Sequence, residues 1–321
     1  MKFRFLCVLP ALALSLASMP AQAEWPEKPV RVVLPGPPGS SPDRITRLFA
    51  DRLSQQWQQP VVVENRPGGT TRIGAGMVAS APPDGYTLLS TFSSHGMAKL
   101  LHPQTPYDPI ADFVPVVKMV SPEVILVVRA DSPYQTLEDL VADVKQRGRP
   151  LEVGNFGVGS GFHFNSLTLG KEAGIDILPV PFKGEALSLA DMLGGHVESS
   201  FNSVGTALPH IREGRVRALA LVSPERSKVL PDVPTFVEEG IPGLREGSWF
   251  GILAPAGTPQ PVIEKVHTDV QALLAEPEVT KWLRDQGLEP VFETPEEFAQ
   301  SLAREVDVSG ALIKEFNVTV N

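Results

Sequence analysis

The chain has 321 residues, a formal net charge of −9 and 42% hydrophobic residues. That length suffices for two domains of ordinary size. The acidic balance argues against nucleic acid as a partner, because a nucleic-acid-binding surface needs an excess of Lys and Arg. It does not argue against a small anionic ligand, since backbone N–H groups can hold a carboxylate on an acidic protein.

The first 23 residues predict a secretory signal peptide. Lys2 and Arg4 precede an apolar run over residues 5–16, and the small-residue segment 21–23 (Ala-Gln-Ala) fits a cleavage site. The apolar run is too short for a permanent membrane anchor. A buried N-terminal helix is the alternative, and the cleavage-site pattern disfavours it. We therefore expect an exported, periplasmic protein.

We expect cleavage after Ala23, which removes the only cysteine of the chain, Cys7. Because Cys7 lies inside the leader and not at the cleavage point, a lipid anchor is not expected. The mature chain can form no disulfide, even in an oxidising compartment. Without Lys2 and Arg4 its net charge falls to about −11. Export also makes cytoplasmic ATP and NADH poor candidates as partners.

Short runs rich in β-branched residues recur along the mature chain and predict strands. These runs are Val30–Leu34, Pro60–Glu64, Tyr86–Phe92, Val124–Arg129, Leu151–Phe156, Ile177–Phe182, Val197–Asn202, Val216–Val222 and Trp249–Ala254. Amphipathic stretches lie between many of them. Such alternation predicts an α/β protein with mainly parallel sheets flanked by helices.

Four stretches have the apolar spacing of helices. They follow Asp43, Thr136, Pro259 and Thr294. Thr136 is a predicted N-cap, and residues 294–297 (Thr-Pro-Glu-Glu) predict a capping box with proline at the first helical position.

The pattern contains no flexible linker, so we expect two lobes joined by strands that cross between them. The candidates for the crossing strands are Val124–Arg129 and Trp249–Ala254. The first lobe would comprise residues 24–126 and 249–321, and the second lobe residues 127–248.

A glycine-bearing loop follows the first predicted strand and precedes a helix. It contains Pro37, Gly39, Ser40, Ser41 and Asp43. Prolines stiffen the loop, glycine leaves backbone N–H groups uncovered, and a helix N-terminus favours an anion. Asp43 could instead be a plain helix cap.

A second loop of this kind follows Leu151–Phe156. It carries Gly157, Ser160, Gly161 and His163. The loop has no P-loop lysine, and it lacks the last glycine of the dinucleotide fingerprint. An anion site built from backbone N–H groups fits it better. His163 could donate to a ligand or pack at the start of the helix.

Two further strand ends could present side chains at the carboxyl edge of a sheet, where open α/β folds bind ligands. They carry Phe182 with Lys183, and Phe201 with Asn202. Core packing is the alternative for both phenylalanines, and a solvated loop charge is the alternative for Lys183.

The mature sequence contains no recognisable catalytic or metal-binding constellation. Metal motifs such as H-E-x-x-H and C-x-x-C are missing, and the segment 157–161 has Gly where a nucleophile elbow has Ser. We therefore expect no enzyme activity, no cofactor and no metal.

Several long motifs resemble those of the Bug family, the periplasmic solute receptors of tripartite tricarboxylate transporters. The similar segments are 60–69 (Pro-Val-Val-Val-Glu-Asn-Arg-Pro-Gly-Gly), 73–75, 83–88 (Pro-Asp-Gly-Tyr-Thr-Leu), 106–109, 217–220, 230–235 (Leu-Pro-Asp-Val-Pro-Thr), 249–251 and 254–259. The resemblance covers essentially the whole mature chain, in order.

This resemblance implies a type II-like periplasmic binding protein whose two lobes close over a small carboxylate, aliphatic or aromatic. Its ligand residues would be Pro37, Gly39, Ser40, Ser41, Asp43, Gly157, Ser160, Gly161, His163, Phe182, Lys183, Phe201 and Asn202. Where the family commonly has Tyr-Lys-Gly and Phe-Asp, this chain has Phe182 and Asn202. Both changes make the pocket less polar, and the second removes a negative charge.

The function expected is capture of a carboxylate by a monomer and its delivery to an inner-membrane permease of the tripartite tricarboxylate type. A ligand sensor for a membrane kinase shares the binding step and is the first alternative. An exported hydrolase is the second, and it would need a nucleophile beside a base.

Overall fold

The computed structural model describes residues 25–69, 71–244 and 248–319. The predicted leader and its cleavage site lie outside the described residues. The strands are β1 (Val30–Leu34), β2 (Val61–Asn65), β3 (Thr87–Phe92), β4 (Phe113–Pro122), β5 (Val124–Arg129), β6 (Leu151–Asn155), β7 (Ile177–Pro181), β8 (Ser199–Ser203), β9 (Val216–Val222), β10 (Phe250–Pro255) and β11 (Leu288–Pro290).

Ten helices lie between and after these strands in the described part of the chain. They are α1 (Ser41–Trp57), α2 (Arg72–Ala79), α3 (Ser94–Leu101), α4 (Leu137–Arg147), α5 (Gly161–Ala173), α6 (Glu185–Leu193), α7 (Val204–Arg212), α8 (Gln260–Ala275), α9 (Pro277–Asp285) and α10 (Pro295–Glu315). Local sequence sets several of their starts. Thr136 and Thr294 both close capping boxes, with Asp139 and Glu297 as the reciprocal acceptors.

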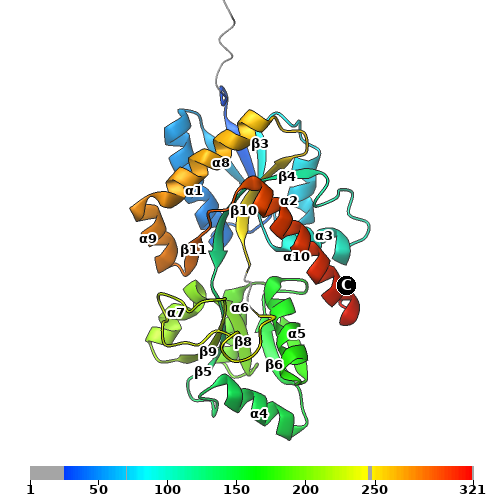
Figure 1. Ribbon diagram of the computed structural model, residues 1–321, viewed down its shortest axis with the longest axis vertical. Helices are drawn as coiled ribbons and strands as arrows, with labels where there is room; N and C mark the ends of the chain where they lie inside the picture. The colour runs from blue at the N-terminus through cyan, green and yellow to red at the C-terminus, as the bar shows by residue number, and fades with distance from the viewer. Residues whose placement is uncertain (1–24, 70, 245–247, 320–321) are drawn as a thin grey trace, which may run out of the picture.

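The strands form two separate sheets, which Figure 1 shows one above the other. The first has the order β11-β4-β10-β3-β1-β2, and the second has the order β7-β6-β8-β5-β9. We refer to each sheet with the helices packed on it as a lobe: lobe 1 for the first and lobe 2 for the second. The α/β class with two helix-flanked sheets is confirmed.

Each sheet is mixed and not mainly parallel, which departs from the expectation. Only β2, β1 and β3 are parallel in lobe 1, and only β7, β6 and β8 in lobe 2. β4 and β5 are joined almost end to end through Glu123, and β10 follows the return to lobe 1. β10 and β5 run against the parallel sets of lobe 1 and lobe 2 and pair with them in antiparallel ladders, whereas β4 pairs, among the described strands, only with β10 and β11, both antiparallel.

The chain passes between the sheets at two places in the described structure. The first lies between Pro122 and Val124, and the second lies between Val222 and Phe250. β5, expected as a crossing strand, lies wholly in the sheet of lobe 2, and β10 lies wholly in the sheet of lobe 1.

Each sheet has an apolar cluster on both of its faces. Val30, Val32 and α8 residues pack on one face of the first sheet, while Val33 and Leu89 pack with Phe298 on the other. The second sheet has the same double cover. Because both faces of each sheet are covered, ligand access is left to the sheet edges, where loops follow the strands.

Candidate ligand-binding site

The loop between β1 and α1 is shaped by its own polar side chains. Gly39 has a φ of 78°, in the left-handed region that glycine tolerates. Its N–H donates to Oδ2 of Asp43 at 2.8 Å, and the Ser40 hydroxyl donates to the carbonyl of Pro37 at 2.7 Å. A Cβ placed on Gly39 would have no atom within 4 Å, so this turn faces open space.

Asp43 uses its carboxylate entirely within lobe 1. It is 4% exposed and accepts from Gly39, from Nε of Arg47 at 3.1 Å and from Nδ2 of Asn65 at 2.8 Å. Burial alone would raise the pKa of Asp43, but these donors outweigh it and lower the pKa. The ionised carboxylate therefore holds the loop in shape.

The loop between β6 and α5 repeats this arrangement. Ser160 donates to the carbonyl of Gly157 at 2.7 Å and accepts from the N–H of His163 at 3.1 Å. The N–H of Gly159 donates to Nδ1 of His163 at 3.2 Å. Burial lowers the pKa of His163 to about 4, so the imidazole is neutral at pH 7. His163 therefore brings no positive charge to this loop.

Several backbone N–H groups of the two loops have no hydrogen-bond acceptor in the part of the chain that the structure describes. Among the described residues, nothing accepts from the N–H groups of Ser41 and Asp43 in the first turn of α1. The same holds for Gly161 and Phe162 in the first turn of α5. Such orphan donors at a helix N-terminus, together with the helix dipole, favour a bound anion.

A third segment, at the end of β3, brings the two loops together. The ring of Phe92 would lie 3.7 Å from a Cβ on Gly36, in the first loop. The Ser93 hydroxyl would lie 3.8 Å from a Cβ on Gly161, in the second loop. The carboxyl edges of the two parallel sets of strands therefore face each other.

Phe92, Ser93 and Ser248 are not among the site residues predicted from the sequence. The hydroxyls of Ser93 and Ser248 are 2.7 Å apart and buried between the lobes. The available signal for Ser93 was its place after the predicted strand Tyr86–Phe92, at a carboxyl edge. Ser248 gave no such signal, because only the return of the chain to lobe 1 places it beside Ser93.

The structure separates the aromatic candidates of lobe 2. Phe182 is half-buried, and its ring would lie 3.5 Å from a Cβ on Gly154. Phe201 is fully buried in the core, with its ring 6.0 Å from that of Phe236. Lys183 is exposed, and no described residue hydrogen bonds or pairs with it. Core packing thus accounts for Phe201.

Two buried amides at the strand ends of lobe 2 each have one unpaired atom. Asn155 accepts from the Gly157 N–H, which leaves its Nδ2 without an acceptor. Asn202 donates to the Ser200 hydroxyl at 2.9 Å and to the Phe201 carbonyl, which leaves its Oδ1 without a donor. Leaving a buried polar group unpaired costs about 1–3 kcal/mol, so such groups usually find a ligand or a water.

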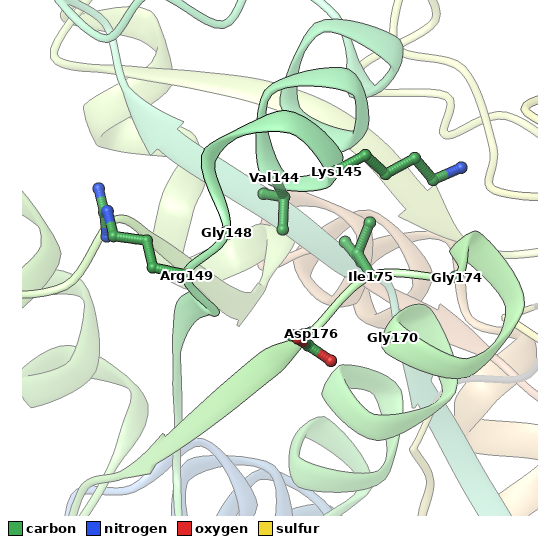
Figure 2. Close-up of a pocket in the computed structure, with 8 residues that line it drawn as sticks. All are labelled: Val144, Lys145, Gly148, Arg149, Gly170, Gly174, Ile175 and Asp176. Carbon is green, nitrogen blue, oxygen red and sulfur yellow. The ribbon is translucent and has the colours of Figure 1, made fainter.

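A surface depression of about 400 Å³ lies elsewhere, between the ends of α4 and α5. Figure 2 shows its lining, which includes Lys145, Arg149 and Asp176. The depression lies where β6 and β7 begin, whereas open α/β folds bind ligands where parallel strands end. We therefore do not assign it to the ligand.

None of the helices that the structure describes is long and apolar enough to cross a membrane. Within the same part of the chain, no group of three or more His, Cys, Asp and Glu side chains could hold a metal ion.

Two helix-flanked sheets whose facing carboxyl edges carry free helix N-termini define a solute-binding protein of the periplasmic type. Residues 45–318 match the family model described as "Tripartite tricarboxylate transporter family receptor". The chain belongs to this family, whose members are receptors and not enzymes.

Three known proteins illustrate the relationship. Protein BugT of Bordetella pertussis is 33% identical over 91% of this chain and 90% of its own length. Rpa4515 of R. palustris, solved with adipate, is 31% identical with a TM-score of 0.83 and covers 92% of this chain and 99% of its own. MatC of Rhodopseudomonas palustris, solved with bound malate, is 32% identical with a TM-score of 0.78 over 90% and 100% of the two chains. The resemblance to the Bug family is thus confirmed.

Proposed function

We propose that this chain is a periplasmic receptor that binds a small carboxylate between its lobes and delivers it to a membrane permease. One observation carries the proposal. The side chains of Ser40, Asp43, Ser160 and His163 make hydrogen bonds within their own lobes, while no described residue accepts from the first-turn N–H groups of α1 and α5. Neutral donors held by rigid loops suit an anion, because they need no rearrangement to bind it.

The remaining features of the site support a ligand with a second polar end. Two donor sets, one from each lobe, could hold two carboxylates or one carboxylate and another acceptor. Asn202 adds an unpaired acceptor and Asn155 an unpaired donor at the floor of lobe 2. The structures of relatives with adipate and malate support a dicarboxylate, with or without a hydroxyl.

Closure of the lobes is the binding motion that fits this arrangement. The free N–H groups at the start of α1 lie in lobe 1 and those at the start of α5 lie in lobe 2. The chain crosses between the two sheets twice in the described structure. A carboxylate that contacts both lobes would favour the closed arrangement, in which both donor sets reach it. We propose that the protein acts as a monomer, that it is cut after Ala23, and that residues near 124 and 249 bound the lobes.

A receptor for a membrane sensor kinase would use the same site and remains the alternative partner. The hydrolase alternative is set aside, since the family is one of receptors. The site agrees with this, because the Ser160 hydroxyl donates to a backbone carbonyl and the ring of His163 accepts from Gly159. The two residues therefore form no nucleophile–base pair.

Isothermal titration of the exported protein with adipate, malate, adipamide and glucose tests the proposal. We expect one or both acids to bind, and the neutral diamide and the sugar to give no heat of binding. Binding of glucose or adipamide with no binding of either acid would overturn the carboxylate assignment.

A further inference from the structure

Helix α10 begins on lobe 1 and ends on lobe 2. Its first half packs in the lobe 1 core through Phe298 and Leu302. In Figure 1 its last turns run down beside α5, well beyond the sheet of lobe 1. There Leu312 and Ile313 pack against a cluster formed by α3 residues of lobe 1 and Phe164 of lobe 2.

Two further contacts join the lobes at the same place. Lys171 of α5 and Glu315 at the end of α10 form an ion pair at 2.9 Å, with 51% and 45% of their side chains exposed. The Leu101 side chain of α3 lies so close to Gly159 of lobe 2 that a Cβ there would overlap it. Apolar, ionic and close-packed contacts therefore coincide on one side of the molecule.

The chain crossings lie away from this contact. Glu123 links β4 to β5. Its backbone N–H donates to the carbonyl of Gly287 in lobe 1, and its backbone carbonyl accepts from the N–H of Val204 in lobe 2. In Figure 1 the neighbouring elements α7 and α9 lie on the opposite side of the molecule from α10 and α5. A rotation about the crossings would therefore separate α10 from α5 and expose the apolar cluster.

We propose that the C-terminal end of α10 is a latch that holds lobe 2 against lobe 1 before any ligand binds. This proposal rests on the lobe closure proposed above. The latch sets the fraction of ligand-free protein that is closed, and that fraction scales the apparent affinity for the ligand. Affinity thus depends on residues that never contact the ligand.

The test measures the distance between the lobes without ligand. Spin labels are placed on cysteines that replace Gln104 in lobe 1 and Asp176 in lobe 2 of the exported protein, which has no other cysteine once Cys7 is removed with the leader. Ile313→Ala removes part of the apolar contact, and we expect the ratio of closed to open molecules to fall about tenfold. Val308→Ala is the matched control, because Val308 lies on the same helix, is 61% exposed and is not among the residues packed at the latch.

The ion pair supplies a second test that does not depend on core packing. Lys171→Glu and Glu315→Lys should each lower the closed fraction, by about two- to fivefold in the ratio, and the double variant should restore it. Unchanged distances in Ile313→Ala and in both reversals would overturn the latch, as would an equal shift in Val308→Ala. Because the distances are measured without ligand, failure to bind adipate or malate would count against the proposed function and not against the latch.

Discussion

Replacing Gly161 by proline removes one backbone N–H donor from the site and changes little else. Gly161 is the first residue of α5, a position that proline favours because its N–H has no partner within the helix. The preceding Ser160 has φ −74° and ψ 158°, within the region open to a residue before proline. We therefore expect Gly161→Pro to fold.

The loss of affinity expected for Gly161→Pro is that of one hydrogen bond to a charged acceptor. A hydrogen bond to a charged acceptor contributes about 1.5–3 kcal/mol, which corresponds to a roughly 10- to 150-fold weaker Kd. Binding should not vanish, because the Phe162 N–H remains free.

Gly161→Ala is the matched control. It keeps the N–H, and its Cβ would make an ordinary 3.8 Å contact with the Ser93 hydroxyl. Isothermal titration with adipate and malate, beside thermal melting of both variants, compares the two. If both variants melt like the parent chain and bind the acids with equal affinity, binding by backbone donors is refuted.

Three further predictions concern charge, pH and the lobe contact. Lys183→Met should leave the melting temperature unchanged and weaken acid binding about tenfold or more, as for a lost bond to a charged group; a change below twofold in titration would remove Lys183 from the site. Burial lowers the pKa of His95 and of His163 to about 4, below the 6.5 of the unfolded state, so protonation favours unfolding and each histidine should contribute a fall in stability of roughly 3 kcal/mol as pH drops from 6.5 to 4. Denaturation midpoints that do not change over this range would contradict it. Gly205→Ala would push a Cβ into the Gln286 carbonyl of the other lobe and should cost on the order of 2 kcal/mol, whereas Gly76→Ala, with its nearest contact at 3.7 Å, should cost nothing in the same unfolding assay.

Elements that depend on local chemistry could be predicted from the sequence. The run 30–34 forms β1 as expected, and the capping boxes at Thr136 and Thr294 form as expected, because each needs only residues three positions apart. β4 was missed because Pro115 and Pro122 interrupt its apolar pattern. The strand tolerates Pro115 where the pairing with β10 is irregular, next to Leu253.

The candidate site also has a part that depends on local sequence and a part that depends on long-range contacts. The two glycine loops could be found because each follows a strand and opens a helix within a few residues. The meeting of Ser93 with Gly161 and Ser248 could not, because those contacts span 68 and 155 positions of the chain and arise only when the lobes are assembled. The assignment of Lys183 to the ligand stays a prediction.

The position of β10 determines the order in which the two sheets can be completed. The strands of the second sheet are contiguous in the chain, from Val124 to Val222. The first sheet cannot close until β10 arrives, because that strand pairs with β3 on one side and β4 on the other. During synthesis, which proceeds from the N-terminus, domains tend to fold as units. The first sheet, begun by about 100 residues before β5, therefore stays incomplete while the second sheet forms. An early stop before Phe250 would leave a folded second sheet joined to a first sheet in which β3 and β4 have no strand between them.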